Sequence, residues 1–229
     1  MDSSTLNNDL EVRRPVGRPR ASGRTPDGDV REQILTAAAN LFLRQGFTAT
    51  TTRQIAAAAG LRQGSLSHYF ERKKDMFHEL LDRTLDAALG ALEGLDENVD
   101  PEIRLWLLLK TDCTNLAGGD QNLASLMLLP EARDTDFIDF WERRDQLKDL
   151  YRSSIQAGID SGTFSPIDPE LALSATFGLV ESLAWWFEPG GSLDPERAAH
   201  HVASAALASL LADPTALDAV IAAANATPS

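Results

Sequence analysis

The chain has 229 residues, a formal net charge of −13 and a hydrophobic content of 43%. These values are typical of a globular protein with a sizeable core. A single cysteine, Cys113, excludes an intrachain disulfide and fits a reducing compartment, where we expect it to be a small buried side chain. The sequence has no apolar run of about 18 residues and no apolar signal segment at its N-terminus. We therefore expect a cytoplasmic protein that does not span a membrane.

The charge is divided unevenly along the chain. Residues 1–75 carry a net charge of +4, whereas residues 76–229 carry a net charge of −17. Nucleic acid attracts the first part and repels the second. The acidity of the second part could also serve only to keep the protein soluble, and the two effects are compatible.

Residues 1–28 are polar, contain several Pro and Gly residues and lack a periodic apolar face, which predicts a disordered basic arm. Arg18 and Arg20 lie in a G-R-P-R sequence that resembles the core of an AT-hook, a segment that binds the minor groove of A·T-rich DNA. Such arms precede some helix-turn-helix domains. The alternative, weighted equally, is a basic tail that attracts phosphates without sequence preference.

A first helix is expected from near Asp29, where Asp29 and Glu32 have capping-box spacing, to Gly46. Thr51 and Gln54 have the same spacing and predict the start of a second helix. Gly60 would end this helix, because glycine adopts positive φ at little cost.

A further short helix is expected from Arg62 or Gln63 to Tyr69. Leu66 and Phe70 share one face of it, and the opposite face carries only small or polar side chains. A bare polar face suits a helix that enters a DNA groove, because the backbone can approach closely and the side chains can bond phosphates and base edges. A helix, a glycine turn, a second helix and then lysines form the helix-turn-helix layout.

The stretch from Arg31 to Leu81 resembles the N-terminal domain of the TetR family of transcriptional regulators. The matching segments are R-E-Q-I-L-T-A-A-A-N-L-F-L-R-Q-G-F, T-T-R-Q-I-A-A-A-A-G-L, G-S-L-S-H-Y-F and K-K-D-M-F. The resemblance implies a homodimeric repressor that a small molecule releases from a palindromic operator. Ser67 stands where the family usually has an aromatic residue and Arg62 where it has a small one, so no operator sequence is carried over.

The expected DNA contacts come from both short helices, the lysines after them and the arm. Gln63, Ser65, Ser67 and His68 should face the groove, while Tyr69 and Lys73 should contact phosphates. The full expected set is Thr51, Thr52, Arg53, Arg62, Gln63, Gly64, Ser65, Ser67, His68, Tyr69, Lys73, Arg18 and Arg20.

The remaining pattern predicts helices only, so we expect an all-α fold. A long helix from Lys73 to about Leu92 should link a DNA-binding domain (residues 29–89) to a helical regulatory and dimerisation domain (residues 90–229). Further helices are expected at 103–116, 120–129, 137–157, 169–187 and 195–211. Asp-Pro-Glu sequences at 100–102, 168–170 and 194–196 provide caps with proline at the first helical position. The tail from Asp213 should add at most a weak helical turn.

The resemblance also implies a ligand pocket inside the second domain. Its candidate lining consists of aromatic residues and one methionine: Trp106, Met127, Phe137, Phe140, Trp141, Tyr151, Trp185 and Trp186. Each of these residues could instead belong to the core or to a dimer interface. The acidity of this domain would favour a neutral or cationic apolar ligand over an anion.

The last two major helices are rich in apolar residues and alanine, which predicts that they meet a partner surface. They resemble the family's helix pair that forms a four-helix bundle across a two-fold axis. The expected interface residues are Phe177, Val180, Ala184, Val202, Ala206 and Leu210.

No enzyme class is indicated. His78-Glu79-Leu80-Leu81-Asp82 lacks the second histidine of the H-E-x-x-H zinc motif, and His200 and His201 have no ligand pattern around them. We therefore expect neither a metal nor a cofactor. The alternative to a ligand-controlled repressor is a dimeric DNA-binding protein that shapes DNA or answers to a protein partner, without a small-molecule inducer.

Overall fold

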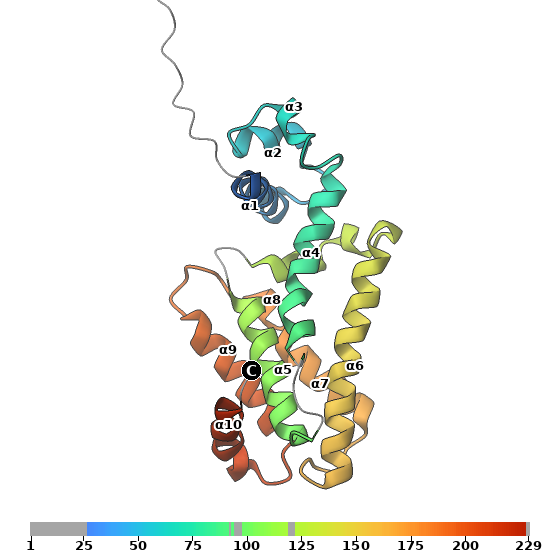
Figure 1. The fold of residues 1–229 in the computed structure, drawn as a ribbon, viewed down its shortest axis with the longest axis vertical. Coiled ribbons are helices and arrows are strands. Elements are labelled where there is room, and N and C mark those ends of the chain that lie inside the picture. The colour runs from blue at the N-terminus through green and yellow to red at the C-terminus, as the bar shows by residue number, and fades with distance from the viewer. Residues whose placement is uncertain (1–26, 92, 94–97, 119–121, 228–229) are drawn as a thin grey trace, which may run out of the picture.

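The computed structural model describes residues 27–91, 93, 98–118 and 122–227. Over these residues the expected all-α fold is confirmed: every regular element is a helix, and the one β pairing is an isolated bridge between Phe164 and Leu211. A small N-terminal unit lies at one end of a long helix, α4, and the remaining helices form a larger body around its other end (Figure 1). The expected basic arm, with Arg18 and Arg20, lies outside the described residues.

The N-terminal unit consists of helices α1 (Asp27–Gln45), α2 (Thr52–Ala58) and α3 (Gln63–Leu66), and it packs on the start of α4 (Lys73–Gly90). The expected cap at Asp29 is wrong, because α1 already begins at Asp27. The third helix is also shorter than expected. The Ser67 hydroxyl donates to the Gly64 carbonyl oxygen at 2.9 Å, and such a local bond competes with continuation of the helix.

Aromatic rings form the centre of this unit. Phe42, Phe47 and Phe77 lie with their ring centroids 4.9–5.4 Å apart, a spacing typical of favourable aromatic pairs. Ile55 and Leu66 from the two short helices are buried beside them. Both short helices are thus held by one small core that α1 and α4 complete.

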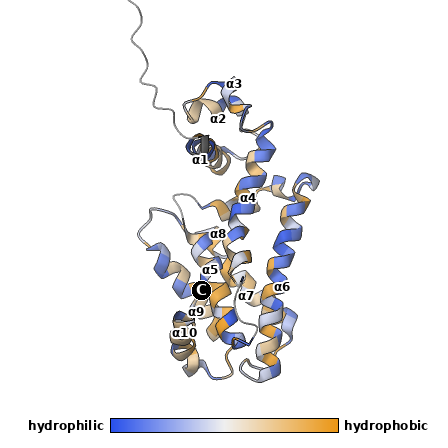
Figure 2. Cartoon of the chain, in the orientation of Figure 1, coloured by the Kyte–Doolittle hydropathy of each residue, from blue (hydrophilic) through white to orange (hydrophobic). Residues whose placement is uncertain are grey.

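The body is built around α5 (Pro101–Ala117), which packs against α4, α6 (Ile138–Ser161), α9 (Pro195–Ala208) and α10 (Leu217–Ala226). Apolar residues gather along the inner sides of these helices (Figure 2). The tail is not the weak turn that the sequence predicted. Val220 and Ala224 of α10 are buried, so the tail completes the core beside α5.

Two expected helices take a different form. The residues between α5 and α6 adopt 3₁₀ turns, η1 (Leu123–Leu128), η2 (Pro130–Arg133) and η3 (Thr135–Phe137), where one α-helix had been expected up to Leu129. The single helix expected at 169–187 is assigned as α7 (Pro169–Glu181) and α8 (Leu183–Trp186). A final 3₁₀ turn, η4 (Pro214–Ala216), precedes α10.

The aspartate caps predicted at the three Asp-Pro-Glu sequences are present at two of them. The Asp168 carboxylate accepts hydrogen bonds from the amides of Glu170 and Leu171, and Asp194 accepts one from Arg197. Asp100 makes no side-chain cap bond, although Pro101 occupies the first turn as expected. No helix in the described residues is long and apolar enough to cross a membrane.

Gly158 allows α6 to pack closely on the segment that follows it. A Cβ atom at Gly158 would lie 2.2 Å from the Phe164 ring, so any larger residue would push this buried ring out of place. The helix ends at Gly162, whose φ of +78° favours glycine.

Candidate DNA-binding interface

The capping box that begins α2 is confirmed. The backbone N–H of Gln54 donates to Thr51 Oγ1 at 3.2 Å, and the backbone N–H of Thr51 donates to Gln54 Oε1 at 2.8 Å. These two bonds satisfy amide groups that a helix start leaves without partners. They fix the first turn of α2, where Thr52 is half-buried and Arg53 is exposed.

The turn between α2 and α3 also follows the sequence prediction. Gly60 has φ +69°, and a Cβ atom there would meet nothing within 4 Å. Conformation rather than crowding therefore explains the glycine at this position. The Leu61 amide donates to the Ala56 carbonyl oxygen at 2.8 Å and closes the end of α2.

The α3 segment presents the two faces that the sequence predicted. Leu66 and Phe70 are buried in the N-terminal core, with 2% and 4% of their surface exposed. Of the expected groove-facing residues, Gln63, Ser67 and His68 are exposed and Ser65 is half-buried. Of the other expected DNA contacts in this segment, Arg62 and Gly64 are exposed and Tyr69 is half-buried. A Cβ atom at Gly64 would have no neighbour within 4 Å, so this surface is bare enough for close approach.

Arg31 of α1 fixes the backbone after α3, a role for which the sequence analysis had no signal. Its guanidinium donates to the Tyr69 carbonyl oxygen at 3.3 Å, stacks 4.2 Å from the centroid of the Phe70 ring and pairs with Glu79 of α4. It therefore ties α1, the α3 segment and α4 together. Only the fold brings these residues, which lie far apart in the sequence, into contact.

Lys73 is placed differently from the expectation that it contacts a phosphate. Its ammonium group donates to the carbonyl oxygens of Phe47, Thr48 and Thr50 at 2.6, 3.2 and 2.7 Å. An ammonium has three N–H donors, so all of them are used within the protein. Burial lowers the pKa of Lys73, and the nearby carboxylate of Glu131 opposes that shift. We assign Lys73 to holding the loop before α2 rather than to DNA.

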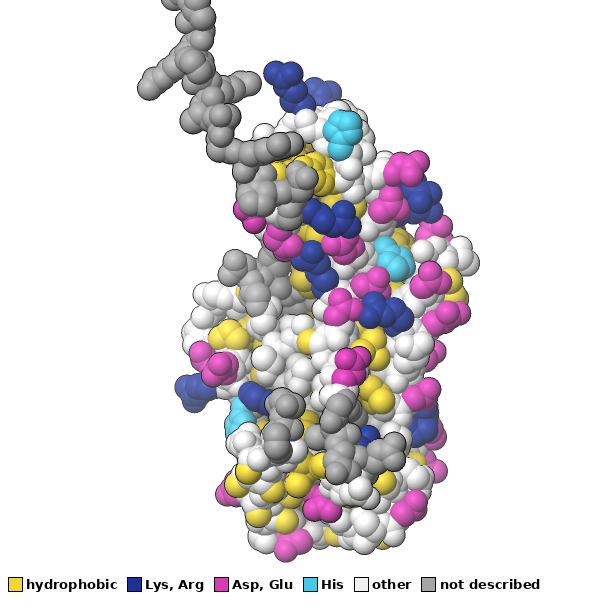
Figure 3. Space-filling model, in the orientation of Figure 1, with side chains coloured by type: hydrophobic (Ala, Val, Ile, Leu, Met, Phe, Trp, Pro, Cys, Tyr) yellow, Lys and Arg dark blue, Asp and Glu magenta, His cyan; other side chains and the backbone are white. Residues whose placement is uncertain are grey.

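The surface charge agrees with the division seen in the sequence. Lys, Arg and His side chains lie at the end of the N-terminal unit that is far from the body, and Asp and Glu side chains are spread over the body (Figure 3). Arg53 and Arg62 contribute to the exposed surface of the short helices. A polyanion would therefore be attracted to this end of the molecule.

Most of the expected ligand-pocket residues are buried in the core of the body. Trp106, Met127, Phe137, Phe140 and Tyr151 are at most 7% exposed. Trp141 is half-buried and donates its indole N–H to the Ala132 carbonyl oxygen at 2.6 Å.

The expectation for Trp185 is wrong, because 75% of its surface is exposed to solvent. Trp186 is 45% exposed and borders a surface hollow of about 530 Å³ together with Lys110, Arg197, His200 and His201. Neither tryptophan therefore lines an interior site in this conformation.

A buried polar group inside the body was not anticipated. The Tyr151 hydroxyl donates to Asp112 Oδ2 at 2.8 Å, and burial raises the pKa of Asp112 to about 6 against the opposing effects of Tyr151 and Arg144. Arg144 lies 4.9 Å from the centroid of the Phe177 ring and pairs with Glu181 of α7. The sequence did hold a signal, since Asp112 shares helical spacing with the buried residues Leu105, Leu108, Leu109 and Leu116.

The expected dimer-interface residues are also wrong. Phe177, Val180, Ala184, Val202, Ala206 and Leu210 are at most 7% exposed, so they pack in the core of the protomer and present little surface to a partner. The exposed face of α7 and α8 instead carries Leu171, Leu179 and Trp185, which are 65%, 40% and 75% exposed. We call this the α7–α8 face.

Comparison with known proteins agrees with this architecture. A model of bacterial regulatory proteins of the tetR family matches residues 34–80, and a model of a tetracyclin repressor-like C-terminal domain matches residues 126–210. The transcriptional repressor KstR2 of Rhodococcus jostii is 32% identical over 188 residues, which cover 77% of this chain and 89% of KstR2.

Solved structures give the same result over more of the chain. AmtR of Mycobacterium smegmatis has a TM-score of 0.74 and 35% identity, covering 92% of this chain and 99% of AmtR. The ketosteroid transcriptional regulator KstR2 of Mycobacterium tuberculosis has a TM-score of 0.71 and 25% identity, covering 85% of this chain and all of that one. The protein therefore belongs to the TetR family of transcriptional regulators, which bind DNA and are not enzymes.

Proposed function

We propose that the protein is a homodimeric repressor of the bacterial cytoplasm and nucleoid that binds a palindromic operator and leaves it when a small molecule binds the body. The observation that carries the DNA-binding part is the exposed polar face of the α3 segment, opposite the buried Leu66 and Phe70. Gln63, Ser65, Ser67 and His68 would read base edges. Phosphates would be bound by Thr51, Thr52, Arg53, Arg62 and Tyr69.

The N-terminal arm would add a second contact. Arg18 and Arg20 would lie in the minor groove beside the operator, because a narrow A·T-rich groove concentrates negative potential. Deleting residues 1–26 from the protein should then remove any A·T preference outside the half-sites. An unchanged preference would leave the arm as a source of nonspecific attraction only.

The α7–α8 face supports the homodimer. Ala175 and Gly178 lie exposed between Leu171 and Leu179, and a Cβ atom at Gly178 would meet nothing within 4 Å. Small residues among exposed leucines allow a second copy of the helix to approach closely and bury apolar surface. A symmetric pair of protomers would place their two α3 segments in successive major grooves of one operator.

The effector is proposed to be neutral or cationic and apolar, because the body is acidic and its interior is aromatic. The alternative is control by a protein partner without an inducer. A thermal-shift screen against a metabolite panel distinguishes the two. A ligand present at about 100 times its Kd would stabilise the protein by about 2.7 kcal/mol. A panel without any such shift would favour the partner.

Selection of the purified protein on random duplex DNA at near-physiological salt tests the proposed function directly. The expected result is an enriched inverted repeat whose half-sites lie about one helical turn apart. Enrichment of A·T-rich sequence without a repeat would instead point to a protein that shapes DNA. The sequence of the repeat would identify the regulated genes.

A further inference from the structure

The N-terminal unit touches the body at a second place besides α4. Glu131 of η2 accepts two hydrogen bonds from Thr48, one from its amide at 3.2 Å and one from its hydroxyl. Thr48 lies in the loop between α1 and α2, and Glu131 belongs to the body, 83 residues further along the chain. The contact therefore adds a polar link between the N-terminal unit and the body to the apolar one that Phe47 makes with Phe137, whose ring centroids lie 6.3 Å apart.

Lys73 holds the same loop through its backbone carbonyl oxygens. Its bonds to Phe47, Thr48 and Thr50 fasten the loop to the start of α4, while Glu131 fastens Thr48 to the body. The Thr48 hydroxyl bond, with a smaller contribution from Lys73, holds the pKa of Glu131 below its usual range, so its carboxylate is charged at neutral pH. Because Thr51 caps α2 directly after this loop, the position of the loop sets the position of α2.

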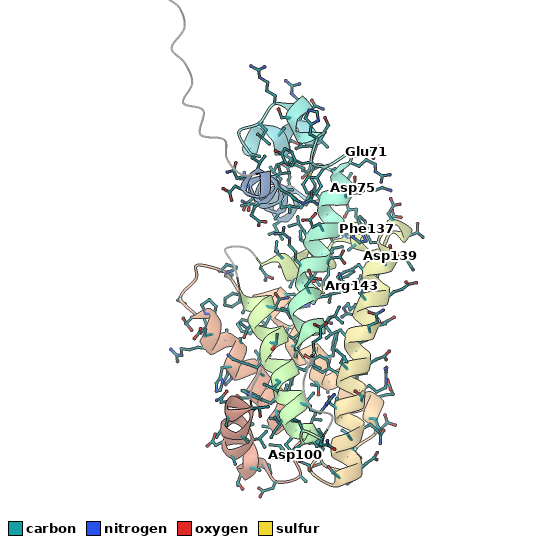
Figure 4. The ribbon with its side chains drawn as sticks, in the orientation of Figure 1. Glu71, Asp75, Asp100, Phe137, Asp139 and Arg143 are labelled. Atoms are coloured by element: carbon teal, nitrogen blue, oxygen red, sulfur yellow. The ribbon has the colours of Figure 1, made fainter. Side chains whose placement is uncertain are left out.

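The segment from η2 to η3, which carries Glu131, is firmly attached to the body. The Ala132 carbonyl oxygen accepts the indole N–H of Trp141, and the Arg133 guanidinium lies 3.9 Å from the centroid of the same ring. Phe137 packs 5.1 Å from Phe77, measured between ring centroids. In Figure 4, Phe137 lies beside α4, between Asp75 at its upper end and Arg143 of α6. Glu131 thus reaches the loop from a fixed support.

We propose that Glu131 is a positioning residue: its contact with Thr48 sets the angle between the N-terminal unit and the body, and through it the spacing of the two α3 segments in a dimer. The proposal rests on the proposed function as a dimeric DNA-binding protein. Glu131 does not touch DNA in this role. A change in the body that moves η2 would reach α2 through this contact directly, in parallel with any tilt of α4.

The test is a double-mutant cycle in the full-length protein, with Glu131→Ala, Thr48→Ala and both together, measured as affinity for the selected operator. We expect each single change to alter the operator Kd by roughly 5-fold or more, the lower end of usual coupling between sites. The double variant should differ from wild type no more than the single variants do, because both remove one contact. Glu142→Ala removes a charge from an exposed residue of α6 and is the matched control, with an unchanged Kd expected.

A second measurement separates orientation from charge. A spin label attached through Ala57→Cys on the exposed side of α2 reports the distance between the two N-terminal units of the dimer without DNA, since the native Cys113 is buried. The distance distribution should shift or broaden in Glu131→Ala and in Thr48→Ala. It should stay as in the wild type in Glu131→Gln, whose amide oxygen can still accept both bonds without the charge, and in Glu142→Ala. Far-ultraviolet circular dichroism and the melting temperature confirm that each variant is folded, and Thr48→Ala, which removes the hydroxyl donor of the contact, carries the test if Glu131→Ala unfolds.

The outcomes are distinguishable. Additive effects on Kd, or a distance distribution in Glu131→Ala and Thr48→Ala identical to that of the wild type, would overturn the role of Glu131 while leaving the proposed function intact. Wild-type protein that binds no duplex from the pool, or that shows no dipolar signal because it is a monomer, would overturn the proposed function itself and this inference with it.

Discussion

Tyr151 donates its hydroxyl hydrogen to Asp112 across 2.8 Å, and both side chains are buried between α5 and α6. A carboxylate in such a place is costly in its charged form, which is why burial raises the pKa of Asp112 to about 6 although Tyr151 and Arg144 favour the charge. Cys113 beside it is buried too, and burial raises the pKa of its thiol. The centre of the body therefore holds a group that titrates close to physiological pH.

The first prediction concerns the stability of the body as a function of pH. The pKa of Asp112 in the folded protein, about 6, lies above the value of 3.8 that is usual for an aspartate in water. The folded state therefore binds this proton more tightly, and the cost of the buried charge is present above pH 6 and lost as pH falls towards 4. The full difference corresponds to about 3 kcal/mol at 1.36 kcal/mol per pKa unit.

Asp112→Asn should remove this dependence, since an amide oxygen can still accept the Tyr151 hydroxyl but carries no charge. Urea denaturation between pH 4 and pH 7 measures the cost of the buried charge as the difference in unfolding free energy between the variant and the wild type. The difference should be largest at pH 7 and shrink as pH falls. Asp139→Asn, at an exposed position of α6, is the control. A pH-independent difference for Asp112→Asn would contradict the assignment.

The second prediction concerns Lys73. Lys73→Met removes a charged donor from three backbone carbonyl oxygens and should destabilise the N-terminal unit by about 1.5–3 kcal/mol. Lys74→Met breaks only a partly exposed ion pair with Asp136 and should cost at most about 1 kcal/mol. Thermal unfolding of both variants measures the difference.

DNA binding separates this structural role from a phosphate contact. A lost phosphate contact lowers the slope of log K against log salt by about 0.9, whereas loss of a structural support weakens binding without that change in slope. We expect the slope of Lys73→Met to equal that of the wild type. A slope lowered by about 0.9 would instead support the prediction from the sequence that Lys73 contacts a phosphate.

Features that depend on neighbouring residues could be predicted from the sequence. The Thr51–Gln54 capping box, the positive φ of Gly60 and the cap at Asp168 each need only local spacing, and all are present in the structure. The buried and exposed faces of the α3 segment followed from helical periodicity in the same way. The capping box, the turn at Gly60 and the two faces of the α3 segment together place the candidate DNA-reading surface.

Features that depend on contacts between distant residues could not be predicted. The bonds of Lys73 to the loop at Phe47 and the contact of Glu131 with Thr48 exist only once the fold is assembled. The residues predicted to meet a partner proved to be buried for a related reason. On a helix that is apolar nearly all round, periodicity does not say which side faces the protomer core, and Val180 turned out to be buried whereas Leu179 is exposed.

The third prediction tests the α7–α8 face as the dimer interface. Leu179→Glu places a charge on this face and should shift the protein from dimer to monomer, because an unpaired charge is not tolerated in an apolar interface. Leu193→Glu is the matched control, since Leu193 is 45% exposed against 40% for Leu179 and lies before α9. Sedimentation equilibrium reports the mass relative to the 24.9 kDa protomer. The assignment would be contradicted if both variants were monomers or if both remained dimers.

The fourth prediction separates base recognition from phosphate contact on the candidate interface. Gln63→Ala and His68→Ala remove exposed side chains of the α3 segment that can bond base edges. Each should cost about 1–3 kcal/mol on the preferred operator and much less on operators altered at the base it reads, so that sequence preference is relaxed.

Arg53→Ala should behave in the opposite way. Arg53 is exposed in the first turn of α2, where a helix start favours phosphate, so its loss should weaken binding to all sequences alike and lower the salt slope by about 0.9. Repeating the duplex selection with each variant measures preference, and titrations at several salt concentrations measure the slope. If Gln63→Ala and His68→Ala kept the wild-type preference, neither side chain would read a base, and base recognition would fall to Ser65, Ser67 or residues outside the α3 segment. Altered preference in Arg53→Ala would move base recognition towards α2.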